Sequence, residues 1–235
     1  MTVTNPILCA IDTPDPGAAG KLVRAVQGEV GGIKLGLEFF GANGPQGVRL
    51  AAAGESSVFL DLKLHDIPNT VAGAVRSVAS LEPMLLTIHT SGGPAMMRAA
   101  AEAATEAAAQ GRRRMKLMGV TVLTSLDGSD LDAVGQRGPV EDQVRRLAGL
   151  AQKSGLDGVI CSPMEVAKLR ADCGKGFLLV VPGIRPAGSA VGDQKRVMTP
   201  REAVDAGADY LVIGRPITEA KDPAAAARAI RAELP

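Results

Sequence analysis

Short apolar runs alternate with longer, alanine-rich amphipathic segments along the whole chain. The short runs are rich in Val, Ile and Leu, and nearly every position in them is apolar. This composition is typical of strands in a parallel sheet that is covered on both faces. The pattern predicts eight such strands, at about residues 7–12, 32–35, 57–63, 84–89, 116–123, 158–161, 177–181 and 210–213.

The longer segments have the apolar spacing of helices. Apolar residues around Leu147 recur at roughly 3.6-residue intervals, the period of a helix with one buried face. Asp222 followed by Pro223 combines an N-cap residue with a proline at the first helical position. Among the helices predicted between the strands are those at residues 17–30, 68–81, 94–110, 139–154 and 222–233.

Eight strand–helix units over 235 residues take about 29 residues each, the size of a compact β/α repeat. We therefore predict an α/β protein with the architecture of a (β/α)8 TIM barrel. No linker rich in Pro, Ser or Gly interrupts the alternation, so we expect one catalytic domain over residues 1–235. The alternative is an open, doubly wound sheet, which is disfavoured because no Gly-x-Gly-x-x-Gly turn follows the first strand.

Composition and charge narrow the classes of function. The 26 Lys and Arg residues nearly balance the 25 Asp and Glu residues, and the chain therefore lacks the basic surplus with which nucleic-acid-binding proteins neutralise phosphates. Its one Tyr, four Phe and no Trp also offer few aromatic rings on which bases could stack. Neither an apolar run of membrane-spanning length nor a signal peptide is visible. Three widely spaced cysteines match no metal motif and suggest reduced thiols. We expect a soluble, cytoplasmic protein without a membrane partner.

In a (β/α)8 barrel, functional groups gather at the carboxyl ends of the strands and in the loops that follow them. Polar residues at these positions are therefore the candidates for a site. They are Asp12, Lys34, Asp61, Lys63, His89, Thr124, Ser125, Ser162, Arg185 and Arg215.

The third predicted strand carries the most informative cluster. Asp61 and Lys63 are two residues apart on a strand, so both side chains point to the same face. Lys34 ends the neighbouring strand, and Asp66 follows shortly after Lys63. Burying a charged side chain costs roughly several kcal/mol of desolvation free energy unless a group of opposite charge pairs with it. We interpret the two lysines and two carboxylates as one neutral catalytic cluster.

Two other interpretations of these charges stay open. The cluster could be an ion-pair network that only stabilises the strand register. Asp66 could be the N-cap of a helix that begins at Pro68. His65 and His89 are expected to support the site rather than to catalyse.

The loops after the last two strands have features of a phosphate site. Barrels often bind a phosphate between these two loops. Gly214 allows close approach of the backbone, and Arg215 can bind the anion with two hydrogen bonds. Residues 182–195 form a long Gly/Pro-rich loop suited to a lid. Alternatively, these glycines and prolines only make turns, and Arg215 is a surface residue.

Seven short motifs occur in a fixed order along nearly the whole chain. They are Ala-Ile-Asp at 10–12, Lys-x-Gly at 34–36, Asp-Leu-Lys-x-x-Asp-Ile-Pro-Asn-Thr at 61–70, Val-Thr-Val-Leu-Thr-Ser at 120–125, Pro-Gly-Ile-Arg-Pro at 182–186, Gly-Asp-Gln at 192–194 and Ile-Gly-Arg-Pro at 213–216. Together these motifs resemble the orotidine 5'-monophosphate decarboxylase family. The Asp-x-Lys-x-x-Asp core from Asp61 to Asp66 is shared with sugar-phosphate relatives, but the full set is highly specific to the family.

The resemblance implies an orotidine 5'-monophosphate substrate, a homodimer, and neither cofactor nor metal. It implies an alternating catalytic array of Lys34, Asp61, Lys63 and Asp66, with Asp66 and Thr70 reaching the site of the neighbouring subunit. The substrate-binding residues that it implies are Asp12, Lys34, Asp61, Asp66, Ile67, Pro68, Asn69, Thr70, Thr124, Ser125, Arg185, Gln194, Gly214 and Arg215.

The implied contacts divide the substrate into parts. Asp12 and Lys34 would hold the ribose hydroxyls, and either Thr124 or Ser125 would contact the pyrimidine. Gln194, Gly214 and Arg215 would bind the phosphate, with Arg185 near the same end. Because no motif for an electron-sink cofactor is visible, our hypothesis is that Lys63 stabilises the carbanion and protonates C6.

Two rival functions remain. A metal-dependent sugar-phosphate decarboxylase or lyase of the same superfamily, such as 3-keto-gulonate 6-phosphate decarboxylase, would have an acidic metal ligand where this chain has Lys34. A lysine there repels Mg²⁺, which favours the metal-free function. A catalytically silent nucleotide-binding barrel would not need Asp61 and Lys63, but both are present.

Overall fold

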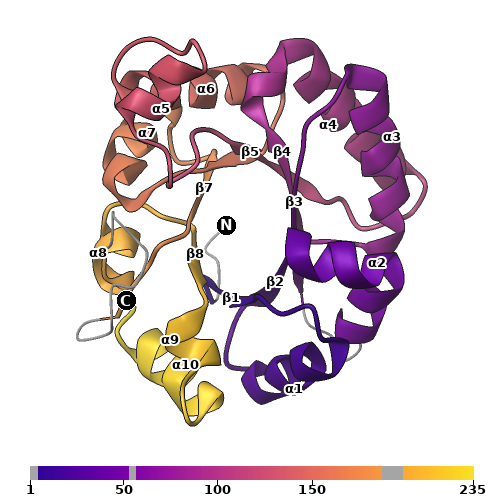
Figure 1. The fold of residues 1–235 in the computed structure, drawn as a ribbon, viewed down its shortest axis with the longest axis vertical. Helices are drawn as coiled ribbons and strands as arrows, with labels where there is room; N and C mark the ends of the chain where they lie inside the picture. The colour runs from indigo at the N-terminus through magenta and orange to yellow at the C-terminus, as the bar shows by residue number, and fades with distance from the viewer. Residues whose placement is uncertain (1–4, 53–56, 187–197) are drawn as a thin grey trace.

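The computed structural model describes residues 5–52, 57–186 and 198–235. In it, eight parallel strands pair in sequence order, and β8 pairs with β1 to close a barrel. Helices surround the barrel, and the first and last helices lie side by side where the ring closes (Figure 1). The (β/α)8 prediction is confirmed. The strands are β1 (Ile7–Ile11), β2 (Gly32–Gly36), β3 (Val58–Leu64), β4 (Leu85–His89), β5 (Lys116–Val120), β6 (Gly158–Ile160), β7 (Leu178–Val181) and β8 (Tyr210–Ile213).

The helices follow the strands around the barrel. They are α1 (Pro16–Val26), α2 (Leu37–Ala52), α3 (Pro68–Val78), α4 (Gly93–Ala109), α5 (Gly128–Ala133), α6 (Val140–Lys153), α7 (Val166–Cys173), α8 (Pro200–Asp205), α9 (Arg215–Thr218) and α10 (Pro223–Ala232). Single 3-10 turns are η1 (Ala79–Leu81), η2 (Thr90–Gly92) and η3 (Pro163–Glu165). In the part of the chain that the structure describes, none of the helices has the length and apolarity needed to cross a membrane.

The predicted helices are present, with shifted ends. α1 begins one residue early because the Asp15 carboxylate accepts hydrogen bonds from the N–H groups of Gly17 and Ala18. It ends at Val26 rather than at residue 30, shortly before Gly28 with its positive φ of 80°. Strand β5 is also shorter than predicted, because residues 121–123 leave the sheet at its carboxyl end.

The core has two layers. The larger layer lies between the strands and the helices and includes Ile7, Cys9 and Ile11 of β1. The smaller layer takes the alternate positions of the strands and fills the barrel. Its members are Leu8, Ala10, Phe59, Leu85, Met118, Val180, Tyr210 and Val212. A polar site in this barrel therefore has an apolar floor.

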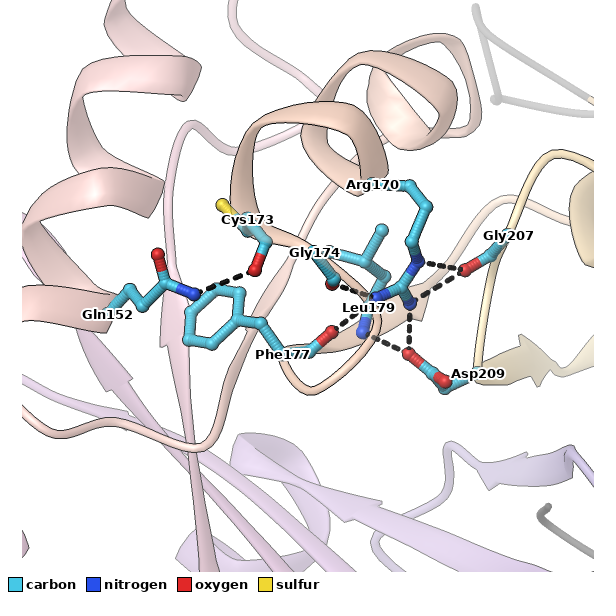
Figure 2. Close-up of polar contacts among 8 residues, drawn as sticks. All are labelled: Gln152, Arg170, Cys173, Gly174, Phe177, Leu179, Gly207 and Asp209. Atoms are coloured by element: carbon cyan, nitrogen blue, oxygen red, sulfur yellow. Dashed lines mark hydrogen bonds and ion pairs between the residues drawn. The ribbon is translucent and has the colours of Figure 1, made fainter. Parts of the chain in front are cut away.

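At the amino ends of the strands, one arginine links three elements (Figure 2). The Arg170 guanidinium of α7 donates to the carbonyls of Gly174, Phe177 and Gly207, and it forms an ion pair with Asp209. The Asp209 carboxylate also accepts the Leu179 N–H of β7 at 2.7 Å. This network connects α7 with the starts of β7 and β8, at the end of the barrel where residues usually serve stability.

Candidate active site

A pocket of about 490 Å³ lies at the carboxyl ends of the strands, large enough for a small-molecule ligand. Its floor contains Ala10, Phe59 and Val212 of the inner core layer. Cys161 adds an uncharged wall, because burial raises the pKa of its thiol. The pocket is lined by Ala10, Asp12, Lys34, Phe59, Asp61, Lys63, Val120, Val122, Leu123, Thr124, Ile160, Cys161, Pro182, Gly183, Arg185, Val212, Gly214, Arg215 and Glu219.

Four charged side chains form a chain of contacts across the pocket. Lys34 Nζ lies 2.9 Å from Asp12 Oδ1 and 4.0 Å from Asp61 Oδ2. Lys63 Nζ lies 2.7 Å from the same Asp61 oxygen. The side chains of Lys34 and Asp61 are only 12% and 14% exposed, so their charges act in a partly dehydrated environment. The predicted convergence of Lys34, Asp61 and Lys63 is present in the structure.

The strand register explains how these groups meet. Ala10 of β1 lies beside Lys34 of β2, and Gly36 lies beside Asp61 of β3. A Cβ atom on Gly36 would stand 3.3 Å from Lys34 Nζ, tighter than an ordinary contact. The absence of a side chain at this position therefore leaves room for the lysine ammonium above the inner core.

Lys63 has an unusual backbone. Its φ is +50°, and within residues 5–52, 57–186 and 198–235 only one other non-glycine residue, Glu82, has a positive φ. The pairing of β3 with β4 shifts register between Leu60 and Leu64, so Lys63 lies in an irregular part of the strand. Non-glycine residues in this region are strained and often occur at functional sites.

The expected phosphate end is partly described. Arg185, Gly214 and Arg215 line the pocket, and their binding of a phosphate stays a prediction. Arg185 is largely buried and donates from Nη1 to the Ile184 carbonyl at 2.9 Å. Gln194 and most of the predicted lid at residues 182–195 lie outside the described residues.

The segment after β3 lies apart from this pocket. Asp66, Ile67, Pro68, Asn69 and Thr70 are exposed, and among the described residues none of the five lines it. Asp66 Oδ1 accepts the Ile67 N–H at 2.6 Å. The N-cap of α3 is Ile67, without a side-chain hydrogen bond, so the interpretation of Asp66 as a helix cap is wrong.

Two predicted site residues that follow β5 differ in their exposure and in their place relative to the pocket. Thr124 lines the pocket, whereas Ser125 is exposed and, in the described part of the chain, does not belong to the lining. Of the two residues that the sequence left open, Thr124 is thus the one that lines the described pocket, and its contact with a pyrimidine stays a prediction.

The histidines form a pair beside the charged cluster. The ring centroids of His65 and His89 are 5.5 Å apart. Burial, with smaller contributions from His65 and Lys63, lowers the pKa of His89. Neither ring lines the pocket as the structure describes it, and the supporting role stays a prediction. Across the described residues, no group of three or more His, Cys, Asp or Glu side chains is arranged to hold a metal ion.

Sequence reasoning missed two polar residues at the site. Glu219 lines the pocket from just beyond α9. Thr87, fully buried on β4, donates its hydroxyl to Asp61 Oδ1 at 2.9 Å. A signal for Thr87 was available, because it is a hydroxyl residue inside the apolar run Leu-Leu-Thr-Ile of β4, the strand that ends at His89. Buried hydroxyls need a hydrogen-bonding partner.

Comparisons with known proteins agree with this geometry. The sequence profile of the Orotidine 5'-phosphate decarboxylase / HUMPS family matches residues 5–230. The orotidine 5'-phosphate decarboxylase of Rhodospirillum rubrum is 59% identical over 232 residues, covering 98% of this chain and 94% of the relative. That of Paramagnetospirillum magneticum is 55% identical over 231 residues, with 98% of each chain covered.

Solved structures show the same relationship. The orotidine 5'-phosphate decarboxylase of Lactobacillus acidophilus superposes with a TM-score of 0.87 at 38% identity, covering 97% of this chain and 98% of the other. That of Pyrococcus horikoshii has a TM-score of 0.75 at 26% identity over similar shares. The barrel, the charged pocket and these matches lead to one assignment: the chain belongs to the Orotidine 5'-phosphate decarboxylase / HUMPS family.

Proposed function

We propose that this protein decarboxylates orotidine 5'-monophosphate to uridine 5'-monophosphate and carbon dioxide, the last step of de novo pyrimidine biosynthesis. The observation that carries the proposal is the contiguous array of Lys34, Asp61 and Lys63 in the pocket, on a chain that shares more than half of its residues with named decarboxylases. Membership of the family supports a carboxy-lyase activity.

The pocket offers a contact for each part of this substrate. Asp12 and Lys34, paired at 2.9 Å, present a carboxylate and an ammonium to the two ribose hydroxyls. Arg185 and Arg215 supply cations for the phosphate, beside the backbone of Gly214. Thr124 can hydrogen-bond to the pyrimidine from the end of β5. The apolar floor then lies near the reacting ring.

The charges provide a mechanism for the bond cleavage. Asp61 would lie beside the substrate carboxylate, and two like charges about 4 Å apart repel by about 4 kcal/mol at an effective dielectric of 20. The bond between C6 and the carboxylate breaks, carbon dioxide leaves, and the electron pair stays on C6. The Lys63 ammonium stabilises this carbanion and transfers one proton to C6, and the lysine then takes a proton from water.

We further propose that a second subunit completes each site. Asp66 and Thr70 are exposed in the single chain, and the intervening Ile67 is 66% exposed although it is apolar. Exposed apolar side chains beside functional residues favour burial in an interface. In the homodimer, Asp66 would follow Lys63 in the alternating array, and Ile67, Pro68 and Asn69 would cover the pocket of the neighbouring subunit.

The reaction proposed here requires neither metal nor cofactor. Of the three carboxylates that line the described pocket, Asp12 and Asp61 each contact a lysine ammonium, an arrangement that opposes the binding of a divalent cation beside them. We also place the enzyme in the cytoplasm, where its three unpaired cysteines stay reduced.

The test follows the absorbance of orotidine 5'-monophosphate with purified protein in EDTA. Rapid conversion to uridine 5'-monophosphate would support both the substrate and the metal-free chemistry. If conversion were absent and a sugar phosphate with Mg²⁺ were consumed instead, the chain would be a metal-dependent relative. Tight binding of uridine 5'-monophosphate without any turnover would identify a silent barrel.

A further inference from the structure

The reactive lysine sits at a break in the sheet. β3 and β4 pair regularly at Leu60 with Leu86 and again at Leu64 with Ile88, but the register shifts between these pairs. Lys63 lies inside the shift with a φ of +50°. Such a bulge removes the regular ladder partner and redirects the side chain, and the positive φ of a non-glycine residue is unfavourable. Other contacts must therefore stabilise this backbone.

A single hydroxyl supplies those contacts. Thr87 Oγ1 accepts the Lys63 backbone N–H at 2.8 Å and lies 2.9 Å from Asp61 Oδ1. Because an N–H can only donate, the hydroxyl proton is available for the carboxylate, and both hydrogen bonds have one consistent direction. Thr87 is fully buried, so water cannot replace either bond without rearrangement.

The two hydrogen bonds of Thr87 contact both Asp61 and Lys63, the two members of the ion pair. Asp61 receives the Thr87 hydroxyl on Oδ1 and the Lys63 ammonium on Oδ2, at 2.9 and 2.7 Å. The carboxylate is thus oriented by one neighbour while it holds the other. In the described lining of the pocket Thr87 itself is absent, so it acts through Asp61 and Lys63 rather than on a ligand.

We propose that Thr87 is a positioning residue of the active site, whose hydroxyl holds the strained Lys63 backbone and the Asp61 carboxylate in the geometry required for turnover. The inference rests on the proposed decarboxylase function. It predicts that the hydroxyl of Thr87 matters more than the shape of the side chain.

Two variants of Thr87 separate the effect of its hydroxyl from the effect of its side-chain shape. Thr87→Val keeps the shape but leaves the Lys63 N–H and one Asp61 oxygen without their partner. Thr87→Ser keeps the hydroxyl and loses a methyl group. Thr90→Val is the matched control, because Thr90 is equally buried and its hydroxyl donates only to the Val120 carbonyl at 2.7 Å.

We expect Thr87→Val to lower kcat by about 10- to 100-fold, the range for a lost hydrogen bond to a charged group. Thr87→Ser should recover kcat to within about threefold of the starting protein, and Thr90→Val should stay within about twofold. The Kd for uridine 5'-monophosphate should change little in all three, since the product lacks the carboxylate that faces Asp61. Crystal structures should show the contact between Asp61 and Lys63 lost in Thr87→Val alone.

Several outcomes would overturn the inference. An unchanged kcat in Thr87→Val, or an equal loss in Thr90→Val, would show that the hydroxyl has no special role. A crystal structure of Thr87→Val with the contact between Asp61 and Lys63 intact would do the same, even in a protein without turnover. Inactivity of the unsubstituted protein toward orotidine 5'-monophosphate would instead contradict the proposed function.

Discussion

At the scale of single residues, the site depends on charges that the fold holds close together. Lys63 Nζ, Asp61 Oδ2 and Lys34 Nζ follow one another at 2.7 and 4.0 Å, and Asp12 extends the row. Each of these two carboxylates contacts a lysine ammonium, so opposite charges alternate along the row. Preorganised charges of this kind need little rearrangement during the reaction, which is where electrostatic catalysis gains most.

The first prediction concerns the proton donor. Lys63→Ala should abolish measurable turnover of orotidine 5'-monophosphate and keep the fold, because the substitution removes the only proposed proton source for C6. Steady-state kinetics and circular dichroism check the two parts. Lys116→Ala is the control, since Lys116 is half-buried on β5 at the opposite end of the barrel. Activity retained in the Lys63 variant would remove this residue from the mechanism.

The second prediction concerns pH and stability. The pKa of His89 is lowered by burial, by His65 and by Lys63, so the native state disfavours its protonation. As the pH falls below 6.5, the ordinary histidine value, the unfolded state binds a proton more readily and stability is lost. Between pH 8 and pH 5.5, the free energy of unfolding, measured in urea, should therefore fall less in His89→Gln than in the unsubstituted protein. Equal losses in both proteins would argue against a shifted pKa.

At the scale of elements, the two ends of the barrel have different tasks. The carboxyl ends of the strands carry the pocket, with a bulge in β3 that redirects Lys63. The amino ends carry structural networks, of which the Arg170 cluster joins α7 to β7 and β8 (Figure 2). This division allows stability and activity to be tested separately.

The third prediction uses that division. Arg170→Leu should lower the free energy of unfolding by about 2–3 kcal/mol, because several carbonyls and the partly buried Asp209 lose their donor. Arg201→Leu should cost less than about 0.5 kcal/mol, since its ion pair with Asp205 is exposed on both sides. Urea unfolding measures both. A similar small loss in the two variants would show that the Arg170 network contributes no more than a surface pair.

At the scale of the whole molecule, we propose that a single subunit holds only part of each active site. Three charges of the proposed array converge in one pocket, whereas Asp66 lies on an exposed segment beside the apolar Ile67. A symmetric dimer would place the same segment of each subunit over the other pocket. Both sites would then share residues between subunits, and neither would work alone.

The fourth prediction tests this sharing. Lys63→Ala and Asp66→Asn should each be nearly inactive as pure dimers. After the two proteins are unfolded and refolded together, half of the dimers should be hybrids with one intact site, which restores roughly a quarter of full activity. Mixing Lys63→Ala with Asp61→Asn, two changes in the same site, is the control and should restore none. Without recovery in the first mixture, Asp66 would act within its own subunit or not at all.

Much of the fold could be predicted from the sequence, because the spacing of apolar residues that marks a strand or a helix is a local property of the chain. The apolar runs located all eight strands to within a few residues, and their alternation with helices predicted the closed barrel. The two-residue spacing of Asp61 and Lys63 placed both in the pocket. Helix α2 was not among the helices named from the sequence; it contains Pro45 and is kinked at Gly44, which has a φ of 57°.

The relations between strands could be learned only from the folded barrel. The pattern of residues was enough to locate the eight strands, the charged residues near their carboxyl ends and the family that the chain resembles. It could not show that Thr87 lies opposite the bulge, that Lys63 has a positive φ, or that Thr124 rather than Ser125 faces the pocket. The physical reason is that register and bulges arise from pairing between segments far apart in the chain, whereas propensity and period act within one segment.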